Sequence, residues 1–305
     1  MRFLRTTTCA ALLSLPAAAV AAQANMDTVQ IRPQQLAPNV YVLFGNGGNI
    51  GLSVGADGAF IVDDQFAPLS DKIRAAIARL TDKPVRFVVN THWHGDHTGG
   101  NEPFGGGGAV IVAHDNVRKR MTVEQFMQRG GQTTRTPPSP AAALPVITFA
   151  EEVTLHLNGD SIHVVHVKPA HTDGDAIIHY TKANVLHMGD TFFMGRYPFI
   201  DLSSGGSVDG ILEAADRGIA LANDATKIIP GHGAVATRKD LQEYRRVIAT
   251  VRDRVCKLIA SGKTQAEAAA AKPSAEFDAA WGTGFINPDL LLDTFYTDLK
   301  ARCRK

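Results

Sequence analysis

Cysteine is scarce in this chain of 305 residues, which contains only three. Cys9 lies near the N-terminus, and Cys256 and Cys303 lie far from every cluster of histidines and carboxylates. Thiolate metal ligands are therefore not expected, although Cys256 and Cys303 could pair in an oxidising compartment. No serine or cysteine lies in a motif that would activate it as a nucleophile, so covalent catalysis is not predicted either.

The chain also lacks an excess of charge of one sign. It has 31 Lys and Arg residues against 30 Asp and Glu residues, a formal net charge of +1. A near-neutral chain has no electrostatic footprint for nucleic acid, so no nucleic-acid partner is expected. After residue 24, no segment is long and apolar enough to cross a bilayer, so no membrane anchor is expected either.

The N-terminus has the features of a secretory signal peptide. Arg2 and Arg5 precede an apolar stretch at 10–20, and Ala22-Gln23-Ala24 fits a small-x-small cleavage pattern. Cleavage after Ala24 is predicted, with cleavage after Ala22 as the alternative. Residues 25–305 would then form one domain without a low-complexity linker, with 29 basic and 30 acidic residues once Arg2 and Arg5 are removed. The mature protein is expected to be periplasmic or secreted.

One short segment concentrates the side chains that bind metals. It follows an apolar run at 85–89, and its ligand-type residues are His92, His94, Asp96 and His97. Imidazole nitrogen and carboxylate oxygen are donors that zinc accepts. In extended chain His92 and His94 point the same way and could grip one ion, while Gly95 would let the backbone turn. Asp96 and His97 would then face a second ion, so the spacing predicts two metals.

The pattern H-x-H-x-D-H after a buried strand, followed by Thr-Gly-Gly-Asn, resembles the signature of the metallo-β-lactamase superfamily. The resemblance covers roughly residues 40–233, and it implies further ligands downstream in the order found here: His171, Asp190 and His232. One zinc ion would be held by His92, His94 and His171. The other would be held by Asp96, His97 and His232, with Asp190 bridging the two.

The resemblance implies a dinuclear zinc hydrolase with two Zn²⁺ per chain and Asp96 and Asp190 as its catalytic carboxylates. Two zinc ions lower the pKa of a shared water from 15.7 to about 7, and a metal-bridged hydroxide would attack a carbonyl or phosphoryl centre. Such a site keeps a charge of about +1 and favours a small-molecule substrate with an anionic group. Arg196, in the loop 191–207, could meet that group, or the loop could be a packed surface segment.

Two further acids are candidates for supporting roles. Asp63 and Asp175 are placed to hydrogen-bond ligating imidazoles, although ordinary strand-end acids are the alternative. His114 opens a predicted helix and could be a cap or a hydrogen-bond donor to the site.

Three alternatives to this function stay open. The first is a β-lactamase proper, but that class usually carries Cys or Ser where this chain has Asp190, and its cysteine type has Lys where Phe193 stands. The second is an iron-dependent redox enzyme, against which the intact His94 and His97 argue. The third is a non-catalytic metal-binding protein, in which a lost ligand would be expected; none is lost. The metal itself (Zn, Fe or Mn), the substrate and the oligomeric state are not predicted.

Short apolar runs alternate with turns and helical stretches in two strand-rich halves. This predicts an α+β fold, an αββα sandwich with the metal site at the sheet edge between the two halves. Predicted strands are 40–44, 50–54, 59–62, 85–89, 109–113, 153–157, 162–167, 176–180, 185–188 and 227–229. Predicted helices are 70–80, 115–128, 208–222 and several in the extension 237–305, which is expected to pack on the domain.

Local signals refine these elements. Ser70 is predicted to be an N-cap, and Asn287-Pro288 to be a cap followed by a first-turn proline. The Gly-, Pro- and Thr-rich segment 130–145 is predicted to be a loop.

Overall fold

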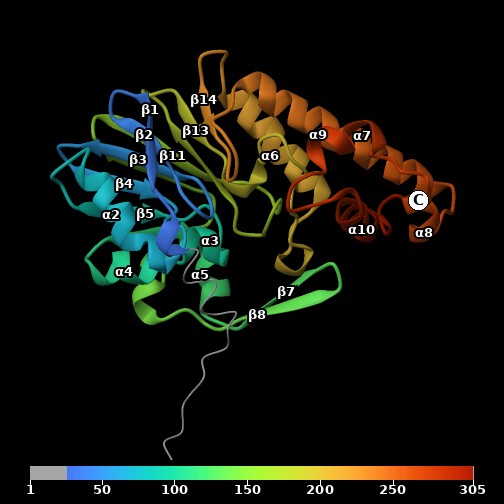
Figure 1. The fold of residues 1–305 in the computed structure, drawn as a ribbon, viewed down its shortest axis with the longest axis horizontal. Helices are drawn as coiled ribbons and strands as arrows, with labels where there is room; N and C mark the ends of the chain where they lie inside the picture. The colour runs from blue at the N-terminus through green and yellow to red at the C-terminus, as the bar shows by residue number, and fades with distance from the viewer. Residues whose placement is uncertain (1–25, 305) are drawn as a thin grey trace, which may run out of the picture.

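Residues 26–304 are described by a computed structural model, and they form four layers (Figure 1). Helices α2 and α4 lie on one side of two packed sheets, and α6, α7 and α10 lie on the other. The predicted αββα sandwich is confirmed. The proposed signal peptide, 1–24, lies outside the described residues. Within the described part of the chain, no helix combines the length and apolar character that a membrane span requires.

The first sheet contains seven strands in the order β1-β2-β3-β4-β5-β6-β9. Strands β1 to β4 are antiparallel neighbours, and β4, β5, β6 and β9 run parallel to one another. The strands are β1 (Arg32–Ala37), β2 (Val40–Phe44), β3 (Ile50–Gly55), β4 (Gly58–Val62), β5 (Val85–Val89), β6 (Val110–His114) and β9 (Ile147–Phe149). Its outer face is covered by α2 (Ser70–Ala78) and α4 (Asn101–Gly106), which bury Ile73, Ile77 and Phe104 against it.

The second sheet has the order β10-β11-β12-β13-β14, antiparallel except for the last pair. Its strands are β10 (Glu152–Leu157), β11 (Asp160–His166), β12 (Ala176–Tyr180), β13 (Val185–His187) and β14 (Lys227–Ile229). Its outer face packs on α6 (Val208–Leu221), α7 (Arg238–Ala260) and α10 (Pro288–Leu299). Valine and isoleucine side chains from both sheets, with Phe60 and Tyr180 in edge-to-face contact, fill the layer between them.

The C-terminal extension is helical, as predicted, and packs on the second half of the domain. Asn287 caps α10 by accepting a hydrogen bond from the Leu290 N–H, and Pro288 occupies the first turn. Along the chain, two short helices, α8 (Gln265–Ala270) and α9 (Ala275–Trp281), connect α7 to α10. A disulfide joins Cys256 of α7 to Cys303, just after α10, so the end of the chain is covalently attached to the layer of helices.

Two local predictions were wrong between residues 115 and 145. Helix α5 (Asp115–Met121) ends early, and the next residues form the hairpin β7 (Gln125–Arg129) and β8 (Gln132–Thr136). Gly130 and Gly131 form the turn of this hairpin, and both have a positive φ. Residues with side chains rarely adopt this backbone conformation, so substitution at either position would strain the turn. In Figure 1 the hairpin projects from the lower side of the molecule, and it pairs with no other described strand.

The structure contradicts one predicted helix cap, at Ser70, and confirms another, at His114. Ser70 is not an N-cap: a 3₁₀ turn at Ala67–Leu69 precedes it, and Ser70 is already helical. His114 does cap α5, since its Nδ1 accepts from the Asn116 N–H. Strand β1 was not predicted, because its side chains are largely exposed and show no apolar alternation.

Candidate metal centre

Four of the predicted ligands lie in a turn after β5 and in the short helix α3 (Gly95–Thr98) that follows it. His92 and His94 lie in the turn, and Asp96 and His97 lie in α3. Asn90 and Asn101, both fully buried, exchange two side-chain hydrogen bonds of 3.0 and 2.8 Å across the ends of this segment. This corrects the expectation that His92 and His94 project from an extended strand, because β5 already ends at Val89. The turn and α3 place His92, His94 and His97 around one space; their rings lie within 4.8 Å of one another in the pairs that include His92.

The other three predicted ligands follow strands of the second sheet. His171 lies in the loop between β11 and β12, Asp190 in a 3₁₀ turn (Gly189–Thr191) after β13, and His232 after β14. Three groups of ligand atoms come together: His92, His94 and His171; His92, His97 and Asp190; and Asp96, His97 and His232. All seven side chains therefore converge at one edge of the sandwich, where both halves meet.

Two glycines allow this approach. A Cβ on Gly48 would lie 2.1 Å from Cε1 of His97, and a Cβ on Gly231 would lie 1.9 Å from Oδ1 of Asp190. Neither distance is compatible with a side chain, so both positions require glycine for close packing against the site.

Four of the histidines have an outward-facing nitrogen that is hydrogen-bonded to a fixed acceptor. Asp63 Oδ2 accepts from Nδ1 of His97 at 2.7 Å, the Phe199 carbonyl from Nδ1 of His171 at 2.7 Å, and Asp201 Oδ2 from Nε2 of His94 at 3.0 Å. The Thr91 hydroxyl donates to Asp63, so it accepts from Nδ1 of His92 at 3.0 Å. In each neutral ring the remaining nitrogen then presents a lone pair to the centre.

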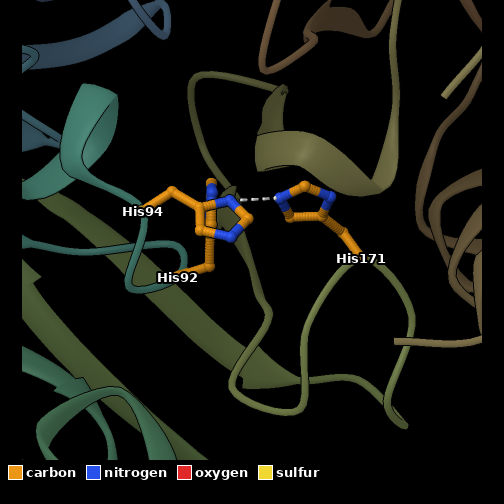
Figure 2. Close-up of side chains that lie close together, drawn as sticks. All are labelled: His92, His94 and His171. Atoms are coloured by element: carbon orange, nitrogen blue, oxygen red, sulfur yellow. Dashed lines mark hydrogen bonds between the residues drawn. The ribbon is translucent and has the colours of Figure 1, made fainter. Parts of the chain in front are cut away.

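His94 and His171 show what this arrangement lacks. Their inward nitrogens, Nδ1 of His94 and Nε2 of His171, face each other at 2.8 Å (Figure 2). With the protons of both neutral rings held by Asp201 and the Phe199 carbonyl, two lone pairs oppose each other. Either a proton on one of the two nitrogens, which gives the hydrogen bond drawn in Figure 2, or a metal ion between the rings removes this repulsion.

Other atoms in the cluster are buried without a hydrogen-bond partner: His92 Nε2, His97 Nε2 and Asp190 Oδ1. The last two lie 3.1 Å apart, but not in hydrogen-bond geometry. Buried polar atoms are normally satisfied, and imidazole and carboxylate donors suit divalent transition metals. The residues present therefore fit a metal centre.

Asp190 touches both sets of predicted ligands. Its Oδ1 lies 3.1 Å from His97 Nε2, and its Oδ2 lies 3.6 Å from His171 Nε2 and 3.4 Å from His232 Nε2. Asp96 contacts one set only, with Oδ2 at 3.6 Å from His97 Nε2 and 3.3 Å from His232 Nε2. Asp190 therefore reaches side chains of both predicted ligand sets, and Asp96 reaches side chains of one.

Electrostatics divides the imidazoles of the cluster into two groups. For His97, burial is outweighed by Asp190, Asp96 and Asp63, which raise its pKa well above the usual value. Burial lowers the pKa of His92 well below its usual value, and burial lowers the pKa of His171 to about 4. Burial opposes charge on Asp190 too, but His232 and His97 outweigh it and hold the Asp190 pKa well below normal. For His232, burial is outweighed by Asp190, which raises the pKa to about 9. A metal ion would have to displace that proton to bind His232.

Of the two acids predicted to hydrogen-bond ligand imidazoles, Asp63 does so and Asp175 does not. Asp63 does bind a ligand-type imidazole, as predicted. Asp175 instead accepts from the backbone N–H groups of His171 and Thr172, at 2.6 and 2.9 Å, and so shapes the loop rather than the ring. Asp201 was missed, because it lies 107 residues from His94 in a segment with no motif.

A cavity of about 580 Å³ opens onto the cluster. His94, Asp96, Asp190 and His232 line its inner end, and the predicted loop 191–207 contributes Arg196 and three aromatic side chains. The lining also includes the apolar side chains of Trp93, between two predicted ligands, and of Phe66, Met127 and Phe285 from distant segments. Arg196 therefore lies at the cavity, as the sequence suggested.

Comparison with known families bears on this geometry. The family model of the metallo-beta-lactamase superfamily matches residues 36–232, which include all seven side chains. The chain belongs to the metallo-β-lactamase superfamily. Members of this superfamily are mostly hydrolases, and this chain has histidine and aspartate groups able to hold metal ions.

Two curated relatives match part of this chain. The alpha subunit of 2,4-dinitroanisole O-demethylase from Nocardioides sp. is 28% identical over 147 residues, which is 46% of this chain and 40% of that protein. Hydroxyacylglutathione hydrolase from Polaromonas sp. is 27% identical over 168 residues, which is 54% of this chain and 55% of that protein. The matched part thus spans about half the length of these relatives, or less.

Solved structures share the fold at low identity. The DIM-1 metallo-beta-lactamase gives a TM-score of 0.59 at 18% identity, covering 73% of this chain and 99% of that one. The sec-alkylsulfatase Pisa1 from Pseudomonas sp. gives a TM-score of 0.70 at 17% identity, covering 90% of this chain and 51% of that one.

Proposed function

We propose that this protein is an exported hydrolase with two zinc ions, acting on a carbonyl or phosphoryl ester or amide. The observation that carries the proposal is the set of inward lone pairs, above all the opposed nitrogens of His94 and His171 at 2.8 Å. His92, His94 and His171 would hold one ion, Asp96, His97 and His232 the other, and Asp190 both. When bound, such ions supply a nucleophile by acidifying water and polarise the substrate oxygen.

The chain's own residues would set the precision of this chemistry. Asp201 and Asp63 fix the orientation of His94 and His97, which keeps their inner nitrogens in place. Asp96 and Asp190 lie at the inner end of the cavity, where a substrate's reacting group would be positioned. A bound substrate would displace water from between the aromatic side chains of the cavity, which would strengthen the electrostatic interactions there.

The substrate would carry an anionic group close to its reacting bond. Two divalent ions against the carboxylates of Asp96 and Asp190 leave the cluster positive. Arg196 adds a cation on the cavity wall and has no ion-pair partner within the described residues. The positively charged N-terminus, the apolar stretch at 10–20 and the disulfide support export to an oxidising compartment.

Elemental analysis tests the proposal. After reconstitution with excess zinc and removal of loosely bound metal, the protein should retain two equivalents, and a chelator should abolish hydrolysis of a panel of lactam, lactone, phosphodiester, sulfate and thioester substrates. A content of one equivalent or less would overturn the dinuclear site. A coloured, iron-loaded protein from native expression would favour the redox alternative. Two tight zinc ions without turnover of any panel member would favour a metal-binding role.

A further inference from the structure

The cavity is larger and more apolar than the metal cluster requires. Two segments outside the predicted ligand motifs contribute to its lining. The β7–β8 hairpin contributes Met127 and Thr136, and the loop between α9 and α10 contributes Phe285. Phe285 is 57% exposed although its ring contacts that of Phe199, so it does not belong to the buried core. The position of Phe285 suggests a binding role rather than a core role.

Phe285 is held from two sides. The guanidinium of Arg129, at the end of β7, lies 3.9 Å from the centre of its ring, and the ring of Phe199 meets it edge-to-face at 5.8 Å. A guanidinium over an aromatic ring is attractive and keeps the ring plane fixed. The Arg129–Phe285 contact therefore connects the hairpin to the C-terminal segment beside the cavity.

Both segments are anchored around this contact. The Gln128 N–H of the hairpin donates to Ser203 Oγ, and the Tyr197 N–H of the cavity loop donates to the Trp281 carbonyl at the end of α9. The Tyr197 hydroxyl also donates to Asp278 of α9 at 2.7 Å. The hairpin, the C-terminal helices and the loop after Asp190 thus support one wall of the cavity together.

We propose that Phe285, fixed by Arg129, forms with Met127 and Phe199 an apolar subsite that binds the alkyl or aryl part of the substrate. This inference rests on the proposed hydrolase function for the reacting end, and it adds the substrate class: an amphipathic anion whose apolar group extends from the metal cluster toward the hairpin. Binding sites of this size usually combine apolar walls with a few polar groups that fix orientation, as Arg196 would here.

Calorimetric titration with two carboxylates of different chain length tests the subsite without requiring turnover. Octanoate and acetate share the carboxylate and differ only in the alkyl chain. Zinc-reconstituted protein should bind octanoate at least about tenfold more tightly than acetate, because the added methylenes leave water. Phe285→Ala should weaken octanoate binding roughly five- to tenfold and change acetate binding less than about twofold. Phe285→Leu should recover most of the loss.

Matched controls come from the same hairpin. Phe126 is 52% exposed but does not line the cavity, so Phe126→Ala should leave both affinities unchanged. Arg129→Ala should weaken octanoate binding roughly threefold, whereas Arg135→Ala, which breaks an ion pair with Glu124 on the hairpin surface, should not. Equal binding of the two carboxylates, or equal losses in Phe285→Ala and Phe126→Ala, would overturn the subsite.

Ester kinetics separate this inference from the proposed function. If the protein hydrolyses 4-nitrophenyl octanoate, Phe285→Ala should raise KM for that ester while kcat and the kinetics of 4-nitrophenyl acetate stay nearly constant. Hydrolysis that does not depend on Phe285 would overturn the subsite and leave the hydrolase intact. Octanoate binding that depends on Phe285, in a protein with two zinc ions and no hydrolytic activity, would support the subsite while the proposed function fails.

Discussion

The carboxylate of Asp201 accepts a hydrogen bond from Nε2 of His94 at 3.0 Å, although 107 residues separate the two in sequence. Asp201 is fully buried and also accepts from the N–H and hydroxyl of Ser204 and from the hydroxyl of Ser203. Burial opposes the charge of Asp201, but His94 and, to a smaller extent, these serine donors outweigh it and hold the Asp201 pKa well below the usual value. A permanently ionised acceptor behind His94 fixes the ring so that Nδ1 faces the cluster.

Asp201→Asn should therefore weaken metal binding with little effect on folding. The amide is nearly the same size, but its NH₂ group cannot accept the His94 proton. We expect a loss of roughly 10- to 100-fold in metal affinity, measured by competition with a chelator of known affinity. Ser203→Ala, which removes a contact to Asp201 without touching His94, is the control. Equal metal affinities for Asp201→Asn and the unsubstituted protein would show that His94 needs no such support.

Asp190→Ala should affect the metal centre far more than the fold. The substitution removes the carboxylate that reaches both ligand sets, so the second zinc should be lost and turnover should fall at least about 100-fold. The unfolding free energy of the metal-free protein should change by no more than about 1 kcal/mol. Metal content, turnover and denaturant unfolding measure these effects, with Asp216→Ala on the surface as the control. Near-native turnover with two tight metals would rule out a bridging role.

Arg196→Ala should discriminate between substrates by charge. Arg196 lines the cavity, and its guanidinium would pair with an anionic group of the substrate in the ground state and the transition state alike. KM for anionic substrates should rise by roughly three- to tenfold with kcat unchanged, and neutral substrates should be unaffected. Steady-state kinetics on a matched pair of esters, one with and one without a carboxylate, measure this. Equal effects on both members of the pair would assign Arg196 to the structure of the loop.

Removing the disulfide should destabilise the C-terminal extension. Cys256 and Cys303 are separated by 47 residues, and closing a loop of this length is worth up to about 4 kcal/mol in the chain-entropy model. The double variant Cys256→Ser, Cys303→Ser should lower the unfolding free energy and speed amide hydrogen exchange in α10 more than in β5. Identical exchange in α10 with and without the bond would show that packing alone fixes the extension.

Much of the fold was predictable because its core elements carry strong local signals. Strand β2 and strand β5 are short apolar runs between turn residues, and they begin and end where the sequence predicted. The ligand motif was equally clear, since four donors lie within six residues. Such elements can be predicted because the apolar residues and the metal-binding side chains that define them are close together in the sequence.

The elements that were missed are stabilised by contacts that the local pattern does not encode. Helix 115–128 was predicted too long because residues 125–129 have no strong breaker, and the hairpin forms through pairing with residues 132–136. Asp201 was not predicted either, because a single acidic residue in a loop is not part of any recognisable sequence motif. The only available signal was that Asp201 is an acid in the loop 191–207, which follows the predicted ligand Asp190 and could therefore lie near the histidines.

Because the predicted ligands come from both halves of the fold, the proposed metal ions would also hold these halves together. His92, His94, Asp96 and His97 belong to the first half, and the three later residues belong to the second. Ions that bind only the assembled edge stabilise the native state by an amount that rises with the logarithm of their free concentration. We therefore expect zinc depletion to destabilise the contact between the two halves and to shorten the lifetime of the protein. The amount of folded protein, and not only its catalytic rate, would then depend on the zinc concentration.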